Sequence, residues 1–126
     1  MLFRWIKNYF ERRDRARWEE WRAGLEFVAQ HKDVRFCQIV RVRQTARTGT
    51  KAYVIWRGNE EVMQAVWIKN CWPKKGDYVI GSGGLGHGTH HEETVFYFSA
   101  VEKVIRNKVF AGYLRYQRLR NVREDA

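Results

Sequence analysis

The sequence predicts an α+β protein, in which a small, mostly antiparallel sheet or barrel of five strands is flanked by an N-terminal and a C-terminal helix. Three observations support this prediction. Apolar residues recur at helical spacing at both ends of the chain, and the middle is rich in alternating apolar and polar residues. Short turns join the middle segments, and no long crossover connection separates them.

The chain is expected to form a single domain, 1–126. Its 126 residues suffice for one core and are too few for two ordinary domains. A hydrophobic content of 44% excludes a wholly disordered chain. The expected parts are an amphipathic helix at 1–30, a β-meander or barrel at 34–104 and a basic helix at 106–122. A barrel of the OB-like or SH3-like kind leaves no strand edge exposed, and a half-open sheet packed on two helices is the alternative.

The N-terminal helix is predicted from a stretch without proline that ends near Ala29. Its apolar side chains fall at helical steps along one side of the chain, and they are Leu2, Ile6, Tyr9, Phe10, Trp18, Trp21, Leu25 and Val28. Such a helix is expected to dock on the barrel or on another protein. A membrane surface is the less favoured partner, although tryptophan and phenylalanine beside arginine and lysine are also typical of interfacial helices.

A meander of three strands is predicted after Asp33, where the apolar period changes to two. In the first strand, 34–43, the even positions are expected to face the core and the odd positions to carry the basic side chains Arg35, Arg41 and Arg43. The second strand, 50–57, separates Ala52, Val54 and Trp56 from Lys51, Tyr53, Ile55 and Arg57. The turn Gly58-Asn59 leads into a third strand at 62–69.

The rest of the barrel is predicted from two further apolar runs. A short strand is expected at 78–80 and a long strand at 94–104, where β-branched and aromatic residues are dense. Between them, residues 81–93 are expected to form a glycine-rich hairpin loop. Gly81, Gly83 and Gly86 match the GxGxxG pattern, but a strand follows them instead of the helix that a dinucleotide site requires. The pattern therefore does not predict a nucleotide site.

The basic residues are concentrated in the predicted meander and in the C-terminal helix. The formal net charge of the chain is +10. Between Asp33 and Glu60 no acidic residue occurs, whereas six basic residues do. Residues 103–123 add seven more basic residues without an acid. This clustering favours a polyanionic partner, because each neutralised phosphate releases condensed counterions.

Single-stranded DNA or RNA is the expected partner, because arginine and lysine bind phosphates while a flat ring stacks on a base. No recognition helix with clear turn signals is present to favour a duplex. Affinity is expected to come from the meander, from Arg47 in its first loop and from the last helix. The candidate binding residues are Arg35, Arg41, Arg43, Arg47, Lys51, Tyr53, Arg57, Arg115 and Arg118. The contrary expectation is that Tyr53, Ile55 and Trp67 lie beneath a helix, with the arginines at its rim.

Two other functions stay open at this level. One is an interaction or assembly protein, or a homo-oligomer, that binds an acidic protein or a nucleoprotein complex through the tryptophan- and arginine-rich helix. The other is a metal-dependent hydrolase whose candidate ligands are His87, His90 and His91. A glycine-rich segment offers poorly oriented ligands, so no metal or other cofactor and no enzymatic activity are predicted.

An intracellular protein, cytoplasmic or nucleoid-associated, is expected from the absence of a signal-like or membrane-spanning apolar run. Cys37 and Cys71 are too few for a disulfide framework and are expected to stay reduced.

Overall fold

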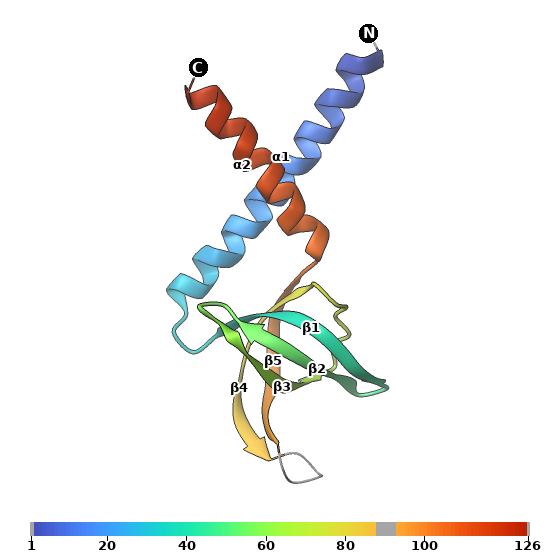
Figure 1. Ribbon diagram of the computed structural model, residues 1–126, viewed down its shortest axis with the longest axis vertical. Coiled ribbons are helices and arrows are strands. Elements are labelled where there is room, and N and C mark those ends of the chain that lie inside the picture. Colours follow the sequence, from blue (N-terminus) through green and yellow to red (C-terminus); the bar gives the residue numbers. More distant parts are fainter. Residues whose placement is uncertain (1, 88–92, 126) are drawn as a thin grey trace.

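A computed structural model gives the structure of the protein and describes residues 2–87 and 93–125. Two helices flank a closed barrel of five strands (Figure 1). In chain order the elements are α1 (Leu2–Gln30), β1 (Arg35–Ala46), β2 (Gly49–Trp56), β3 (Asn59–Lys69), β4 (Tyr78–His87), β5 (Thr94–Ile105) and α2 (Asn107–Asp125). The predicted fold class is confirmed, in the form of a closed barrel instead of a half-open sheet.

The strand order around the barrel is β1-β2-β3-β5-β4, and β4 pairs again with β1. The first three strands form the predicted antiparallel meander. β5 joins β3 in parallel and β4 in antiparallel orientation. β1 is long enough to pair with β2 along most of its length and with β4 through residues 35–38. The barrel is therefore mixed, with a single parallel pairing among the described strands.

Apolar side chains from all five strands fill the interior of the barrel. The fully enclosed members of this core are Cys37, Ile39, Ala52, Val54, Val66, Ile68, Val79, Phe96 and Phe98. Burial in this apolar interior raises the pKa of the Cys37 thiol, so the group stays protonated and inert.

A second apolar cluster joins the two helices to the outside of the barrel. Its centre is Trp21 of α1, which is only 2% exposed. Around it lie buried side chains of β1, β4, β5 and α2, namely Phe36, Tyr78, Ile80, Ile105 and Val109. Beyond this cluster α1 and α2 cross, and their far ends project away from the barrel (Figure 1). At the crossing, both carboxylate oxygens of Asp14 accept hydrogen bonds from Arg115, at 2.8 and 2.9 Å.

The predicted alternation along β1 was wrong in its first half and correct in its second, where Val42 packs against the barrel core while Arg41 and Arg43 are exposed. Ile39 pairs with Val54 and Arg41 pairs with Tyr53, so Val40 is an extra residue in a β-bulge. The bulge reverses which positions face inward, and a strict period of two cannot reveal it. In the first half Cys37 and Ile39 fill the barrel, while Phe36 faces the helices, so both faces are covered there.

The expected loop at 81–93 was also wrong over its first seven residues, because β4 continues to His87. Gly81 and Gly83 are needed because β4 and β5 approach each other closely, and not because this segment has to be flexible. A Cβ atom on Gly81 would collide with the carbonyl oxygen of Ala100, and one on Gly83 with that of Tyr97. A glycine run inside a strand thus marks two backbones in contact. Residues 88–92 lie outside the described part of the chain.

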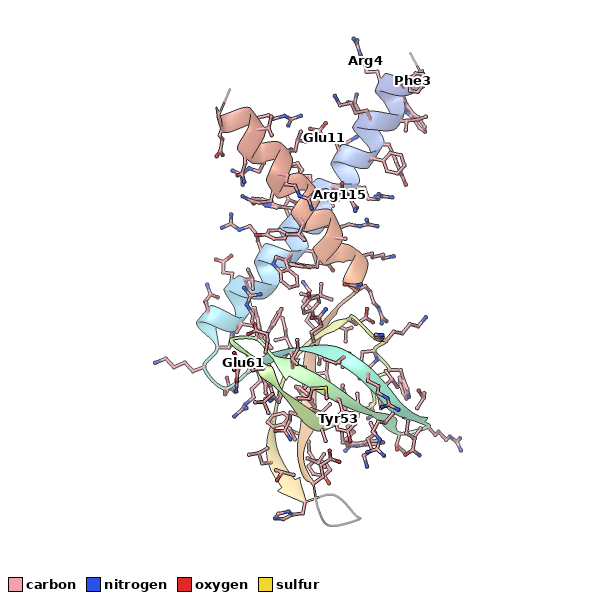
Figure 2. All side chains as sticks on the ribbon, viewed as in Figure 1. Phe3, Arg4, Glu11, Tyr53, Glu61 and Arg115 are labelled. Carbon is pink, nitrogen blue, oxygen red and sulfur yellow. The ribbon has the colours of Figure 1, made fainter. Side chains whose placement is uncertain are left out.

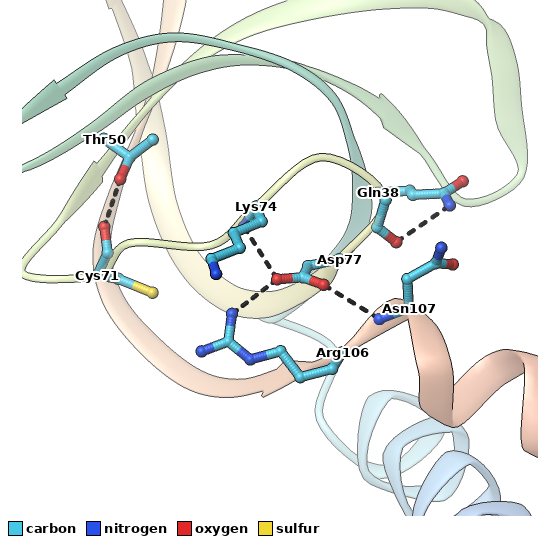
Figure 3. A network of polar contacts seen from close by, with 8 residues as sticks. Gln38, Thr50, Cys71, Lys74, Asp77, Arg106 and Asn107 are labelled. Atoms are coloured by element: carbon cyan, nitrogen blue, oxygen red, sulfur yellow. Dashed lines mark hydrogen bonds and ion pairs between the residues drawn. The ribbon is translucent and has the colours of Figure 1, made fainter.

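Asp77 ties the barrel to α2 through a buried polar network (Figure 3). The carboxylate accepts hydrogen bonds from the backbone amide of Lys74 at 2.9 Å, from Arg106 at 2.7 Å and from the backbone amide of Asn107 at 3.0 Å. The last bond caps the first turn of α2. Burial acts to raise the pKa of Asp77, but these three donors outweigh it and the pKa is lowered.

Asp77→Ala is expected to lower the free energy of unfolding at pH 7 by about 2 to 3 kcal/mol, because two backbone amides lose a partner and α2 loses its cap. The folded pKa of Asp77 lies below its unfolded value, so the carboxylate stabilises the fold above that value. This stability is lost as the pH falls below about 4. Urea unfolding at pH 7 and pH 3 should show a smaller acid effect in the variant. Glu102→Ala, an exposed control, should behave like the natural chain at both pH values.

Candidate nucleic-acid interface

The outer face of the meander brings together four of the predicted binding residues, namely Arg41, Arg43, Lys51 and Tyr53. Arg41 of β1 lies directly opposite Tyr53 of β2. Lys51 lies two positions from Tyr53 on the same face and opposite Trp67 of β3. Trp67 is in turn a neighbour of Tyr97 on β5. Positive groups and flat rings therefore alternate across this side of the barrel.

Arg43 is held beside Tyr53. Its guanidinium carbon lies 5.4 Å from the centre of the Tyr53 ring, and Nη1 donates a hydrogen bond of 2.8 Å to the phenol oxygen. The same nitrogen is 3.8 Å from a carboxylate oxygen of Glu93, with both side chains nearly half exposed. An exposed pair of this kind contributes little to stability and exchanges readily. Glu93 therefore offsets part of the positive charge of Arg43.

A groove of about 490 Å³ lies on the other side of β1, between that strand and the segment that connects β3 to β4. Its lining combines positive and apolar groups, namely Arg41, Val42, Thr45, Trp72, Pro73, Lys74 and Lys75. The indole nitrogen of Trp72 donates a 2.7 Å hydrogen bond to the carbonyl of Ala46, which fixes the ring while 47% of the residue stays exposed. Arg41 borders both the groove and the outer face.

Trp72, Lys74 and Lys75 are absent from the residues that sequence reasoning selected. They fall in the run 72–75, which precedes the strand predicted at 78–80. Its composition of one indole and two adjacent ammonium groups was the available signal, and the predicted meander has the same mixture.

Arg47 lies at the tip of the β1–β2 hairpin and is exposed there. Among the described residues, no acidic side chain pairs with Arg41, Arg47, Lys51, Lys74 or Lys75.

Helices do not cover this surface in the part of the chain that the structure describes. The cluster beneath the helices contains neither Tyr53 nor Trp67. Figure 2 shows Tyr53 on the barrel wall, below the projecting helices. Ile55 is different, because it lines a cavity of about 190 Å³ together with Trp21 and Phe110. Thus Ile55 alone of the three side chains expected beneath a helix borders the helices in the described structure.

Arg35 and Arg57 lie apart from Arg41 and Arg43, at the end of the barrel that faces α1. The Arg35 guanidinium sits 5.2 Å from the ring centre of Trp56 and 5.1 Å from that of Phe96. That of Arg57 lies 5.4 Å from the Phe36 ring. Both arginines line an open cleft of about 710 Å³ beside the last turns of α1.

The two candidates on α2 are also separate from the meander face. Arg115 is engaged with Asp14 where the helices cross, and Figure 2 shows it well above Tyr53. Arg118 is exposed on the projecting part of α2. Trp18, a candidate for a partner interface, donates a 2.8 Å hydrogen bond to Gln117 and packs against Tyr116. Arg115 and Trp18 therefore make contacts within the protein, where α1 and α2 cross.

Among the described residues, the histidine segment does not form a metal site. His87 is exposed at the end of β4, and its carbonyl accepts a 3.0 Å hydrogen bond from Tyr97. His90 and His91 lie outside the described residues. Within 2–87 and 93–125, no three histidine, cysteine or acidic side chains are grouped to hold a metal ion.

Fold and surface together define a small α+β barrel with an uncovered basic and aromatic side. Comparisons with family models, with curated proteins and with solved structures found no match to this chain. In the described ranges, neither helix has an apolar stretch long enough to cross a bilayer.

Proposed function

We propose that the protein binds single-stranded DNA or RNA through the basic-aromatic surface, defined as the outer face of the meander, the β1–β2 hairpin and the groove at Trp72. The observation that carries the proposal is the position of Arg41, which borders both the Tyr53 face and the Trp72 groove. Cationic groups positioned between partly exposed rings suit a flexible strand, since phosphates and unstacked bases are then bound side by side.

The strand order supports this proposal by analogy. A five-stranded barrel in the order β1-β2-β3-β5-β4 resembles the OB architecture. OB barrels bind oligonucleotides on the face of strands 2 and 3 and with the loops that follow strands 1 and 4. In this chain Tyr53 and Trp67 lie on that face, and Arg47 lies in the first of those loops. The analogy concerns architecture alone, and a binding function requires suitable side chains on that architecture.

The first test removes charge from the groove. Lys74→Ala with Lys75→Ala is expected to weaken binding of every single-stranded oligonucleotide and to reduce the slope of log K against log salt by about 1.4, because each lost phosphate contact contributes about 0.7. Fluorescence anisotropy with labelled single- and double-stranded DNA and RNA, at several salt concentrations, measures both quantities. Lys32→Ala with Lys108→Ala removes equal charge elsewhere and should change the slope little.

Trp72→Ala in the same titrations should lower affinity by about 5- to 150-fold, the range for one lost base stack, while leaving the salt slope unchanged. Affinity that is indifferent to salt, or no affinity at low salt, contradicts the proposal. Equal losses in the groove variant and in its charge-matched control would show that only net charge matters, which also contradicts it.

A further inference from the structure

The first turns of α1 expose a group of large apolar side chains that the rest of the described chain does not cover. Phe3 is 87% exposed, Trp5 63%, Tyr9 51%, Phe10 44% and Ile6 36%. These residues precede the crossing with α2, where the helix projects away from the barrel (Figure 1). Scattered single apolar residues on a surface need no explanation, but five within eight positions of one helix indicate a contact surface.

The group forms one side of the helix. At 100° per residue, the five side chains occupy an arc of roughly 160°. Lys7 lies beside one edge of this arc and Arg12 beside the other, while Arg4 lies on the opposite side. A face rich in aromatic residues, bordered by long cationic side chains, is the pattern of a helix that lies in a membrane interface. The cationic side chains can extend from the edges of the arc to anionic headgroups.

The charge around this segment favours an anionic partner over a second copy. The two projecting helix ends, residues 2–17 and 115–125, hold ten basic residues and four acidic ones. Of the acids, Asp14 is engaged by Arg115 and Glu11 pairs with Arg123. Two copies joined through this face would bring two positive ends together, and the repulsion disfavours a homodimer there.

We infer that residues 3–12 of α1 form an anchor that lies in the interface of an anionic lipid bilayer, with Phe3, Trp5, Ile6, Tyr9 and Phe10 among the acyl chains and with Lys7 and Arg12 at the headgroups. The sequence placed a membrane second to a protein partner for this helix. The structure changes that preference, because Trp18 and Trp21 are occupied within the fold and the remaining apolar group has cationic edges. The inference concerns a different surface from the proposed function and does not rest on it.

The full chain can be tested by co-sedimentation with vesicles of phosphatidylcholine alone and of phosphatidylcholine with phosphatidylglycerol. We expect binding to the anionic vesicles at least tenfold stronger than to the neutral ones. Trp5→Glu should lower the anionic partition coefficient at least tenfold. Leu85→Glu likewise replaces an apolar side chain by a carboxylate, at a residue of β4 that is 64% exposed, and it should alter binding less than twofold.

The contribution of charge is tested with Lys7→Gln combined with Arg12→Gln. Each cation near an anionic surface strengthens binding about fivefold, so a loss of roughly 25-fold is expected on anionic vesicles and little change on neutral ones. Circular dichroism of every variant checks that the exposed substitutions leave the helices intact. Vesicle binding that is absent, equal for both lipid compositions, or equally reduced by Leu85→Glu overturns the inference. A dimer that Trp5→Glu dissociates, without vesicle binding, also overturns it in favour of a second copy.

Discussion

Gly83→Ala is expected to reduce the free energy of unfolding by roughly 3 to 5 kcal/mol. The added Cβ would meet the carbonyl oxygen of Tyr97, an atom of the backbone itself. No side-chain rotation relieves a collision between a Cβ atom and a backbone oxygen, so β4 and β5 must separate locally. Separation lengthens the ladder hydrogen bonds that close the barrel, each worth about 1 kcal/mol.

The neighbouring glycine offers a matched control for this prediction. A Cβ on Gly84 meets no other atom within 4 Å. Gly84→Ala should therefore leave stability unchanged or raise it by a few tenths of a kcal/mol, because alanine restricts the unfolded chain. Urea denaturation followed by tryptophan fluorescence compares the two variants. Similar losses at both positions would contradict close strand approach as the reason for Gly83.

Trp21→Ala is the second substitution with a large expected effect, a loss of about 3 to 5 kcal/mol. The ring centre of Trp21 lies 4.5 Å from that of Phe110, 4.7 Å from that of Tyr78 and 5.5 Å from that of Phe36. One side chain thus connects α1 to α2 and to two strands. Truncation leaves a cavity among aromatic rings, which relax only partly into the space.

Trp5→Ala is the control for Trp21→Ala, since it removes the same side chain from the exposed part of α1. Because Trp5 is 63% exposed, the expected change is within about 0.5 kcal/mol. The measurement is thermal or urea unfolding by far-ultraviolet circular dichroism, which reports helices and barrel together. If Trp21→Ala were as stable as Trp5→Ala, the helices would not depend on this aromatic cluster for their attachment.

The sequence predicted the fold well because most of its signals are local. Helical spacing in α1 and the Gly58-Asn59 turn depend on neighbours a few residues apart. The two errors have a different origin. The bulge at Val40 and the glycines of β4 are set by which backbones meet across the barrel, and no local pattern contains that information.

The residues of the candidate surface also divide into those that local patterns predict and those that distant contacts place. Arg41, Lys51 and Tyr53 come together because adjacent antiparallel strands place them there, as the meander predicted. Arg115 is separate because it pairs with Asp14, a residue 101 positions earlier in the chain. Trp72 lies at the surface because the segment between β3 and β4 passes beside β1. Turn residues alone do not predict that course.

The crossing of α1 and α2 has a consequence for the order of folding. Asp14 and Arg115 are 101 positions apart, whereas β1, β2 and β3 are joined by short turns. Closing a long loop before intervening structure exists carries a large entropic cost, so local hairpins form first and distant contacts form late. We therefore expect the two helices to meet only after barrel closure has carried both to the same end of the molecule.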